Sequence, residues 1–291
     1  MKHKKMNNKH IEYQMVFPCK HLKKYIEYYW IMKDIDREHT IKLMPDVRTS
    51  MFFIKKATAK YNTTSTTTLN CGFVGAHRDY TTLKINGEME MIGIQFNMVG
   101  AYALFGDISS DCASKIVCSD KFPVLKMLME LINDEPNIND VAKIFNEFFL
   151  ELQLQNINHN LDVLTQFNNA AYTQTSCIKN VDMKWQTYVG IRQQERWFNK
   201  YIGFSPNKFK IIQRFRAALY ELIKCNHAGH LEELANNIGY NDLSHMTKDF
   251  LNLCGMTPGK FSEYLRNSHI DLSQKLIYQF HSDGCCSICS F

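Results

Sequence analysis

A short pattern of residues occurs twice in the last third of this chain, and the two copies lie 52 residues apart. Each copy has a basic residue, a phenylalanine, a glycine, a hydroxyl residue followed by proline, and a second phenylalanine at the same offsets. The copies are Arg196, Phe198, Gly203, Ser205-Pro206 and Phe209, and then Lys248, Phe250, Gly255, Thr257-Pro258 and Phe261, with Arg214 and Arg266 also in register. A unit this small cannot bury an apolar face alone, so the tandem pair predicts two similar subdomains side by side.

The excess positive charge lies in the same segment. Residues 176–268 contain 13 Lys/Arg and 8 Asp/Glu, an excess of five that equals the net charge of the whole chain. A basic module joined to a neutral one is typical of a domain that binds a polyanion, and phosphates are the usual polyanion.

Composition excludes several classes of protein. The chain has 10 cysteines, but their scatter does not form a disulfide framework. The basic residues 1–10 are followed by Ile11-Glu12-Tyr13-Gln14, which interrupts the apolar core that a signal peptide needs. No run of about 18 apolar residues is present, so no membrane span or membrane partner is expected. We therefore expect a cytoplasmic protein.

Residues 11–115 read as a β-rich domain. Short strands are expected at 51–54 and 72–74, and the Asn86-Gly87 pair predicts a hairpin that joins 82–85 to a strand ending at Phe96. The Thr-rich stretch 63–68 is expected to be an exposed loop, and residues 23–32 a short aromatic-rich helix.

Residues 116–171 are expected to form a helical bridge. Apolar residues recur with a helical period near Leu125 and again near Val141, and a third helix is expected at 161–171. These helices either pack on the β-rich domain or form a dimer surface, and the two interpretations are compatible.

Capping residues mark the helices of the C-terminal module. Ser205-Pro206 predicts a helix start, and the helix should run to about Cys225 with a buried stripe of Phe209, Ile212, Phe215, Leu219 and Leu222. A short helix at 231–235 should end at Gly239, and Asp242 or Ser244 should cap the next, which is the order of a helix-turn-helix. The helix from 206 to 225 would span roughly 30 Å, close to the roughly 34 Å between successive major-groove faces on one side of DNA.

The second copy carries a family resemblance. Residues 239–250 and 255–258 closely resemble the second helix-turn-helix of the AraC/XylS family of bacterial transcription regulators, Gly-Tyr-x-Asp-x-Ser-His-Phe-x-Arg-x-Phe followed by Gly-x-Thr-Pro. Met246 and Lys248 replace the family's phenylalanine and arginine. The resemblance implies an α+β multidomain fold: a β-rich regulatory or dimerisation domain (11–115), the helical bridge (116–171), and an all-α DNA-binding domain of two helix-turn-helix subdomains joined by a long helix (172–268). The tail 269–291 is expected to be disordered.

Two other regions match the family less closely. Leu43-Met44-Pro45-Asp46 looks like a Leu-Pro-Asp-Gly turn in the β-rich domain of one branch of the family, with Val47 in place of the glycine. In the first helix-turn-helix, Lys184 and Tyr188 stand where the family has alanine and the turn glycine. The first motif is therefore either distorted or shifted so that Gly190 makes the turn, and we expect the second motif to dominate binding.

The resemblance assigns the DNA contacts. The residues expected to face base edges are Arg192, Glu195, Arg196, Ser244, His245 and Lys248. The alternatives are a solvated helix face, an Arg196–Glu pair, and a His245 that caps or buttresses its own helix. Lys208, Lys210 and Arg216 are expected to meet phosphates.

The expected partner is double-stranded DNA, with RNA polymerase, a second copy of the chain and a small-molecule effector as further candidates. No cofactor, metal or catalytic residue is expected. The terminal Cys285-Cys286-Ser287-Ile288-Cys289 lacks the second cysteine pair of a zinc finger. The alternative functions are an enzyme or small-molecule-binding protein with an N-terminal active domain, and an interaction protein whose degenerate first motif has lost specific binding.

Overall fold

The computed structural model describes residues 12–34, 38–61, 68–106, 115–117, 121–132, 137–155, 190–225 and 230–267. Several expectations lie outside these residues: the basic N-terminus, most of the Thr-rich loop, the helix at 161–171, the positions of Lys184 and Tyr188, and the cysteine-containing tail. Among the described helices, none has the length and apolar character that crossing a membrane requires.

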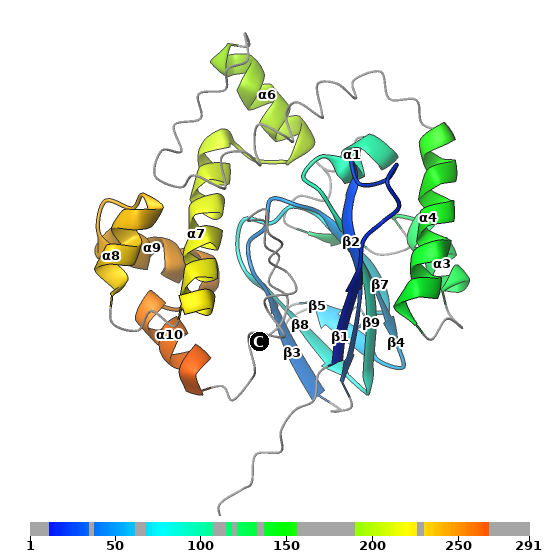
Figure 1. The fold of residues 1–291 in the computed structure, drawn as a ribbon, viewed down its shortest axis with the longest axis horizontal. Helices are drawn as coiled ribbons and strands as arrows, with labels where there is room; N and C mark the ends of the chain where they lie inside the picture. The colour runs from blue at the N-terminus through cyan, green and yellow to red at the C-terminus, as the bar shows by residue number, and fades with distance from the viewer. Residues whose placement is uncertain are drawn as a thin grey trace, which may run out of the picture.

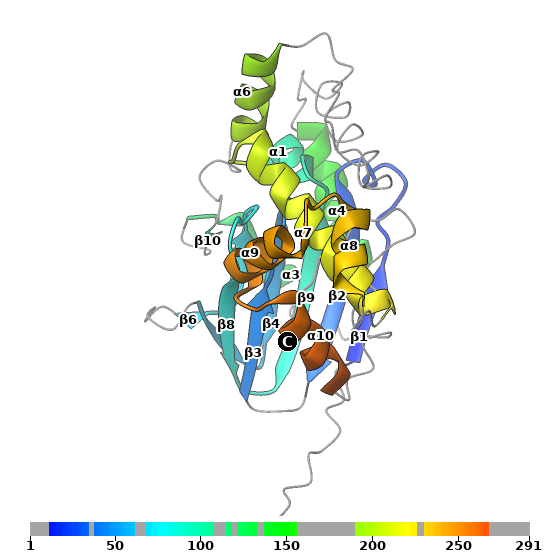
Figure 2. The same ribbon diagram turned by 90° about the vertical axis from the view of Figure 1, so that its left-hand side faces the viewer.

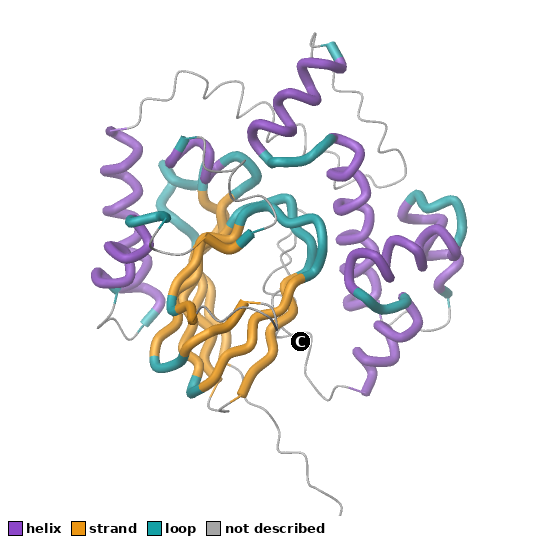
Figure 3. Tube along the Cα trace, turned by 180° about the vertical axis from the view of Figure 1, so that it is seen from behind, coloured by secondary structure: helices purple, strands orange, loops and turns teal. Residues whose placement is uncertain are grey.

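The N-terminal part consists of two antiparallel sheets (Figures 1 and 3). The larger has the order β1-β2-β9-β4-β7-β10, with β1 Glu12–Val16, β2 Ile26–Asp34, β9 Met89–Phe96, β4 Ser50–Lys55, β7 Cys71–Val74 and β10 Ile116–Val117. The smaller has the order β3-β8-β5-β6, with β3 Glu38–Leu43, β8 Thr81–Asn86, β5 Thr58–Tyr61 and β6 Thr68–Leu69. The strands expected at 51–54 and 72–74 are β4 and β7.

The helix expected at 23–32 is wrong, because most of that segment is strand β2. Its side chains alternate between two apolar clusters: Tyr28 and Trp30 contribute to one, and Tyr29 and Ile31 to the other. A strand buried on both faces shows a continuous apolar run, which hides the period of two. Aromatic and β-branched residues also favour the pleated conformation.

The hairpin expected at Asn86-Gly87 is also wrong, although the chain does turn there. Strand β8 pairs with β3 and β5, whereas β9 pairs with β2 and β4. Gly87 has a φ of 112°, and a Cβ at this position would lie 2.9 Å from the Lys56 carbonyl oxygen. An Asn-Gly pair specifies the turn, but here the turn passes the chain from one sheet to the other.

Helices cover one face of the larger sheet (Figure 1). These are α1 (Gly100–Phe105), α3 (Val124–Leu131) and α4 (Ile138–Gln155), and their buried residues join the apolar cluster of the sheet. Phe145 of α4, for example, has its ring centroid 5.2 Å from that of Tyr29. The interpretation that the bridge helices pack on the β-rich domain is confirmed for α3 and α4.

The C-terminal part is helical, and its helices begin and end at the expected signals. They are α6 (Ile191–Tyr201), α7 (Pro206–Cys225), α8 (Leu231–Ile238), α9 (Leu243–Cys254) and α10 (Pro258–Asn267). All five residues of the predicted α7 stripe are buried. Figures 1 and 2 show α6 at the start of α7 and the α8–α10 group beside its later part.

Candidate nucleic-acid interface

The second helix-turn-helix is formed by α8, the turn at Gly239 and α9. Gly239 has a φ of 85°, in the left-handed region that terminates helices, and its N–H donates to carbonyls of the last turn of α8. Asp242 caps α9, since its carboxylate accepts a 2.7 Å hydrogen bond from the His245 N–H. Of the two caps that the sequence allowed, the structure uses Asp242.

An apolar core fixes the orientation of α9. Phe250 lies between Phe215 of α7 and Phe261 of α10, with ring centroids 4.9 and 6.3 Å away, and Met246 is fully buried beside it. Burial of this face leaves the opposite face of α9 at the surface. There Ser244, Thr247, Lys248, Leu251 and Asn252 line a depression with Glu232 and Leu243.

Ser244 and Lys248 are exposed as a base-reading role requires, but His245 is not. The His245 side chain is half-buried, with its ring edge-on to Tyr240 at 5.2 Å. Its Nε2 lies 3.1 Å from the Arg214 guanidinium. In this arrangement His245 contacts the protein interior, in line with the buttressing alternative.

In the first helix-turn-helix, the three residues expected to read bases share one face of α6. Arg192, Glu195 and Arg196 are exposed, and their spacing of three and four residues places them side by side on the helix. Gly190 immediately precedes α6 with φ −62° and ψ 155°, an extended conformation that any residue can adopt. The helix expected before it lies outside the described residues.

The buried face of α6 rests partly on the N-terminal part. The ring of Tyr201 packs edge-on against that of Tyr102 in α1, with centroids 4.7 Å apart. The Lys200 ammonium lies over the Tyr102 ring. Phe198 contacts Phe209 of α7 at 5.2 Å, and both belong to the apolar cluster of the larger sheet.

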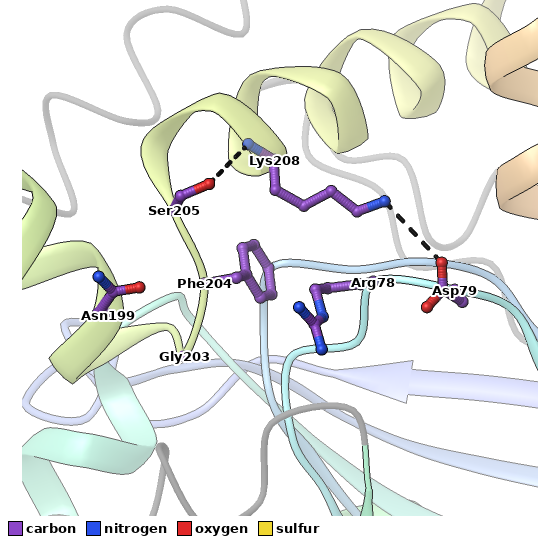
Figure 4. Close-up of a pocket in the computed structure, with 7 residues that line it drawn as sticks. All are labelled: Arg78, Asp79, Asn199, Gly203, Phe204, Ser205 and Lys208. Atoms are coloured by element: carbon purple, nitrogen blue, oxygen red, sulfur yellow. Dashed lines mark hydrogen bonds and ion pairs between the residues drawn. The ribbon is translucent and has the colours of Figure 1, made fainter.

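The three residues expected to meet phosphates have different environments. Lys208 is partly exposed at the start of α7, where its ammonium lies 3.9 Å from Asp79. Figure 4 shows it beside a hollow lined by Arg78, Asn199 and Ser205, whose Oγ accepts the Lys208 N–H. Lys210 is half-buried. Arg216 is only 7% exposed, so it is not available to a phosphate in this conformation.

Arg216 belongs to a buried charge cluster that joins the two parts of the chain, the Asp46 cluster (Glu27, Asp46, Arg48 and Arg216). The Asp46 carboxylate lies 2.7 Å from Arg216 and 3.1 Å from Arg48, which also pairs with Glu27. Burial alone would raise the pKa of Asp46, but the guanidiniums of Arg216 and Arg48 outweigh it and hold that pKa below its ordinary value.

Sequence reasoning missed this cluster, because it places Asp46 only in a turn and treats Arg216 only as a cation on a basic helix. One signal was available: two opposite charges two residues apart, Asp46 and Arg48, stand between the apolar stretches 43–45 and 51–53. Charges in such surroundings are paired when buried.

Two family models match separate parts of the chain. Residues 186–264 match the family model described as a helix-turn-helix domain, and residues 14–117 match a domain of unknown function, DUF6597. A search of curated proteins gives no match.

Among solved structures, ToxT from Vibrio cholerae O395 aligns with a TM-score of 0.45 and 11% identity, over 82% of this chain and 98% of that one. ToxT bound to (E)-4-(8-methylnaphthalen-1-yl)but-3-enoic acid gives a TM-score of 0.43 and 11% identity, over 88% and 99%. The AraC-like transcriptional activator CuxR gives a TM-score of 0.29 and 9% identity, over 94% and 88%.

The fold of residues 190–267, the cap at Asp242 and the domain match define a helix-turn-helix DNA-binding protein. The match to this AraC-type helix-turn-helix domain is consistent with an AraC/XylS regulator and supports a DNA-binding transcription regulator.

Proposed function

We propose that this regulator places α6 and α9 in successive major grooves of one duplex. The observation that carries the proposal is the connecting helix: α7 has 20 residues, a length of about 30 Å at about 1.5 Å per residue. Successive groove faces are roughly 34 Å apart. Helix α6 precedes α7, and α9 packs against α7 at Phe215; each of these two helices has an exposed polar face and a buried apolar one.

The test is a site-size experiment. A duplex library with random sequence would first be selected for binding to the full chain, and the preferred site would be footprinted. The proposal predicts protection of two half-sites one helical turn apart, and a fall to single-half-site affinity when about five base pairs, half a turn, are inserted. A footprint confined to one groove would overturn it.

We further propose that the N-terminal domain restrains the two recognition units relative to each other. Contacts to both units support this role: Tyr102 packs on Tyr201 of α6, and the Asp46 cluster holds the middle of α7. Near the α9–α10 turn, a Cβ on Gly255 would lie 3.0 Å from the hydroxyl of Tyr80. A domain that contacts both units limits how their separation can vary.

The variant that tests this restraint is Asp46→Asn, which removes the carboxylate between Arg216 and Arg48. Removing one partner of a buried pair is costly because the other charge stays buried. The variant should bind sites with altered half-site spacing with a smaller loss of affinity than the unchanged chain. Asp140→Asn, on the exposed side of α4, is the matched control and should leave the spacing preference unchanged. Identical spacing profiles for all three proteins would contradict the restraint.

An effector, a second copy of the chain and RNA polymerase are further proposed partners of the regulator. Each would act through the N-terminal domain if it altered the contacts of Tyr102 or Asp46. Measuring the spacing profile with and without a candidate partner would test that route.

A further inference from the structure

One guanidinium, that of Arg214 on α7, contacts the second helix-turn-helix at four places. It donates to the Asp249 carboxylate at 3.0 Å and lies 3.1 Å from His245 Nε2. It also reaches the Gly239 carbonyl at 3.5 Å and stacks over the Tyr240 ring at 4.3 Å. These four residues lie in the turn and in α9 as far as Asp249, so Arg214 joins the connecting helix to the part of the motif that a DNA groove would receive.

The contact between Arg214 and His245 determines which ring nitrogen of His245 accepts a hydrogen bond. An arginine can only donate hydrogen bonds, so His245 Nε2 must accept, which places the ring hydrogen on Nδ1. Tyr240 packs edge-on against the same ring. Both contacts turn His245 toward α7 and away from the exposed face of α9.

The outer face of α9 therefore consists of other residues than the family pattern suggests. Ser244 and Lys248 are exposed and Thr247 is half-buried; their spacing places the three side chains together on one face, and all three line the same depression, which His245 does not. Thr247 carries both a hydroxyl group, which can bond to a base edge, and a methyl group, which can contact the methyl of thymine.

We propose that Arg214 is a positioning residue for α9. It holds His245 and Asp249 on the inner side of the helix, and so leaves Ser244, Thr247 and Lys248 as the residues that read base pairs. This inference rests on the proposed function only in that α9 enters a major groove; it does not require α6 to enter a second one.

The experiment compares Arg214→Gln and Arg214→Lys with Lys210→Gln, a control one helical turn earlier on α7. Each variant of the full chain would be measured against the selected site and against a set of single base-pair substitutions across it, at several salt concentrations. Circular dichroism and thermal unfolding would establish that each variant is folded.

A positioning role has a distinct signature. Arg214→Gln should lower affinity for the selected site about tenfold, and should flatten discrimination only at the base pairs read by α9, with an unchanged salt slope. Arg214→Lys should not restore discrimination, because an ammonium cannot satisfy planar contacts to both His245 and Asp249. Lys210→Gln should keep the discrimination profile, and if Lys210 meets a phosphate the salt slope should fall by about one.

Two results would overturn the inference. One is that Arg214→Gln lowers the affinity equally for the selected site and for all of its base-pair substitutions, with a salt slope lower by about one. That result would make Arg214 a phosphate contact. The other is that His245→Gln changes the discrimination at a single base pair while Thr247→Val changes it nowhere. That result would show that His245 reads a base pair. If Arg214→Gln does not fold, Arg214→Lys and its double-mutant cycle with Asp249→Asn decide the case, and additive effects would refute the coupling.

Failure of this inference is distinguishable from failure of the two-groove proposal. A footprint limited to one groove disproves the latter, whereas the base-pair profile of α9 still shows whether Arg214 positions it.

Discussion

The two helix-turn-helix units differ in what their buried faces pack against. Phe250 of the second unit packs between residues of α7 and α10, within an apolar cluster made almost entirely of the C-terminal helices. Phe198 and Tyr201 of the first unit belong instead to the cluster of the N-terminal sheet. The orientation of α9 is therefore set locally, whereas the orientation of α6 depends on a second domain.

This difference accounts for how the two sequence copies can diverge. The second copy keeps the cap and the turn glycine that a self-supporting unit requires, and its Asp249 pairs with Arg214 of the connecting helix. The first copy receives part of its packing from Tyr102, a residue outside the repeat. A unit that packs on another domain has fewer constraints on its own sequence.

The largest expected effects come from the two core phenylalanines. Phe250→Ala and Phe198→Ala should each lower the free energy of unfolding by about 3–5 kcal/mol, because each removes a fully buried ring. Hydrogen exchange resolved by segment should then separate them: Phe250→Ala should raise exchange in α8–α10, and Phe198→Ala in α6 and in α1. Unchanged exchange in α1 for Phe198→Ala would refute the shared packing.

A smaller effect is expected when a DNA-facing residue of either unit, Lys248 or Arg196, is replaced and the affinity for DNA is measured. Lys248→Ala and Arg196→Ala should each weaken binding by about 1–3 kcal/mol if the residue reads a base, or reduce the salt slope by about one if it meets a phosphate. Lys248→Ala should have the larger effect, since α9 is held by its own core and by Arg214. The measurement is titration against the selected site at several salt concentrations. Retained affinity and salt dependence in both variants would remove these residues from the interface, and a larger loss for Arg196→Ala would reverse the order of the units.

The two glycines that precede the recognition helices offer a smaller matched comparison. Gly239→Ala should destabilise the second unit by roughly 1–2 kcal/mol, because its φ of 85° is unfavourable for an L-residue. Gly190→Ala should change stability by well under about 1 kcal/mol, since its φ is −62° and no atom lies within 4 Å of the added Cβ. Thermal unfolding measures both, and an equal loss at the two sites would mean that Gly190 also makes a constrained turn.

The features that were predictable from sequence are local ones. Ser205-Pro206, Gly239 and Asp242 each act through hydrogen bonds within a few residues, so the bounds of α7 and the turn before α9 could be derived from the chain alone. The pairing of β8 and the strand conformation of 26–34 depend on partners far along the chain, and local signals do not identify those partners.

The same distinction applies to the site. The exposure of Ser244 and Lys248 follows from the helical period, which is a local property. The withdrawal of His245 and Arg216 from the surface arises from Arg214 and Asp46, which lie 31 and 170 residues away in sequence. Only the folded structure brings these pairs together.

The smallest expected effect is a dependence on pH of the contact that Asp46 and its neighbours make with α7. This effect tests whether the first unit depends on the N-terminal domain for its position. Burial lowers the pKa of His77, and the nearby Asp46 carboxylate only partly opposes the shift. Backbone groups of Gly75 and Met44 also favour the protonated ring, whereas the charge of Arg216 disfavours it. The balance is a lowered pKa, because protonation would place a second positive charge in a buried site beside that guanidinium.

Since the folded-state pKa of His77 lies below the ordinary 6.5, its contribution to stability is present above pH 6.5 and is lost as the pH falls through the folded value. Asp46 behaves differently, because its lowered pKa keeps the pairs with Arg216 and Arg48 charged until the pH falls below 3.8. Between these limits, acidification should lower the protection against hydrogen exchange, relative to the intrinsic exchange rate at each pH, in residues 43–48 and in α6. The variant His77→Asn should remove most of that pH dependence. An unaltered pH response in His77→Asn would place the titrating group elsewhere, and a response in residues 43–48 without one in α6 would show that the first unit holds its position without the N-terminal domain.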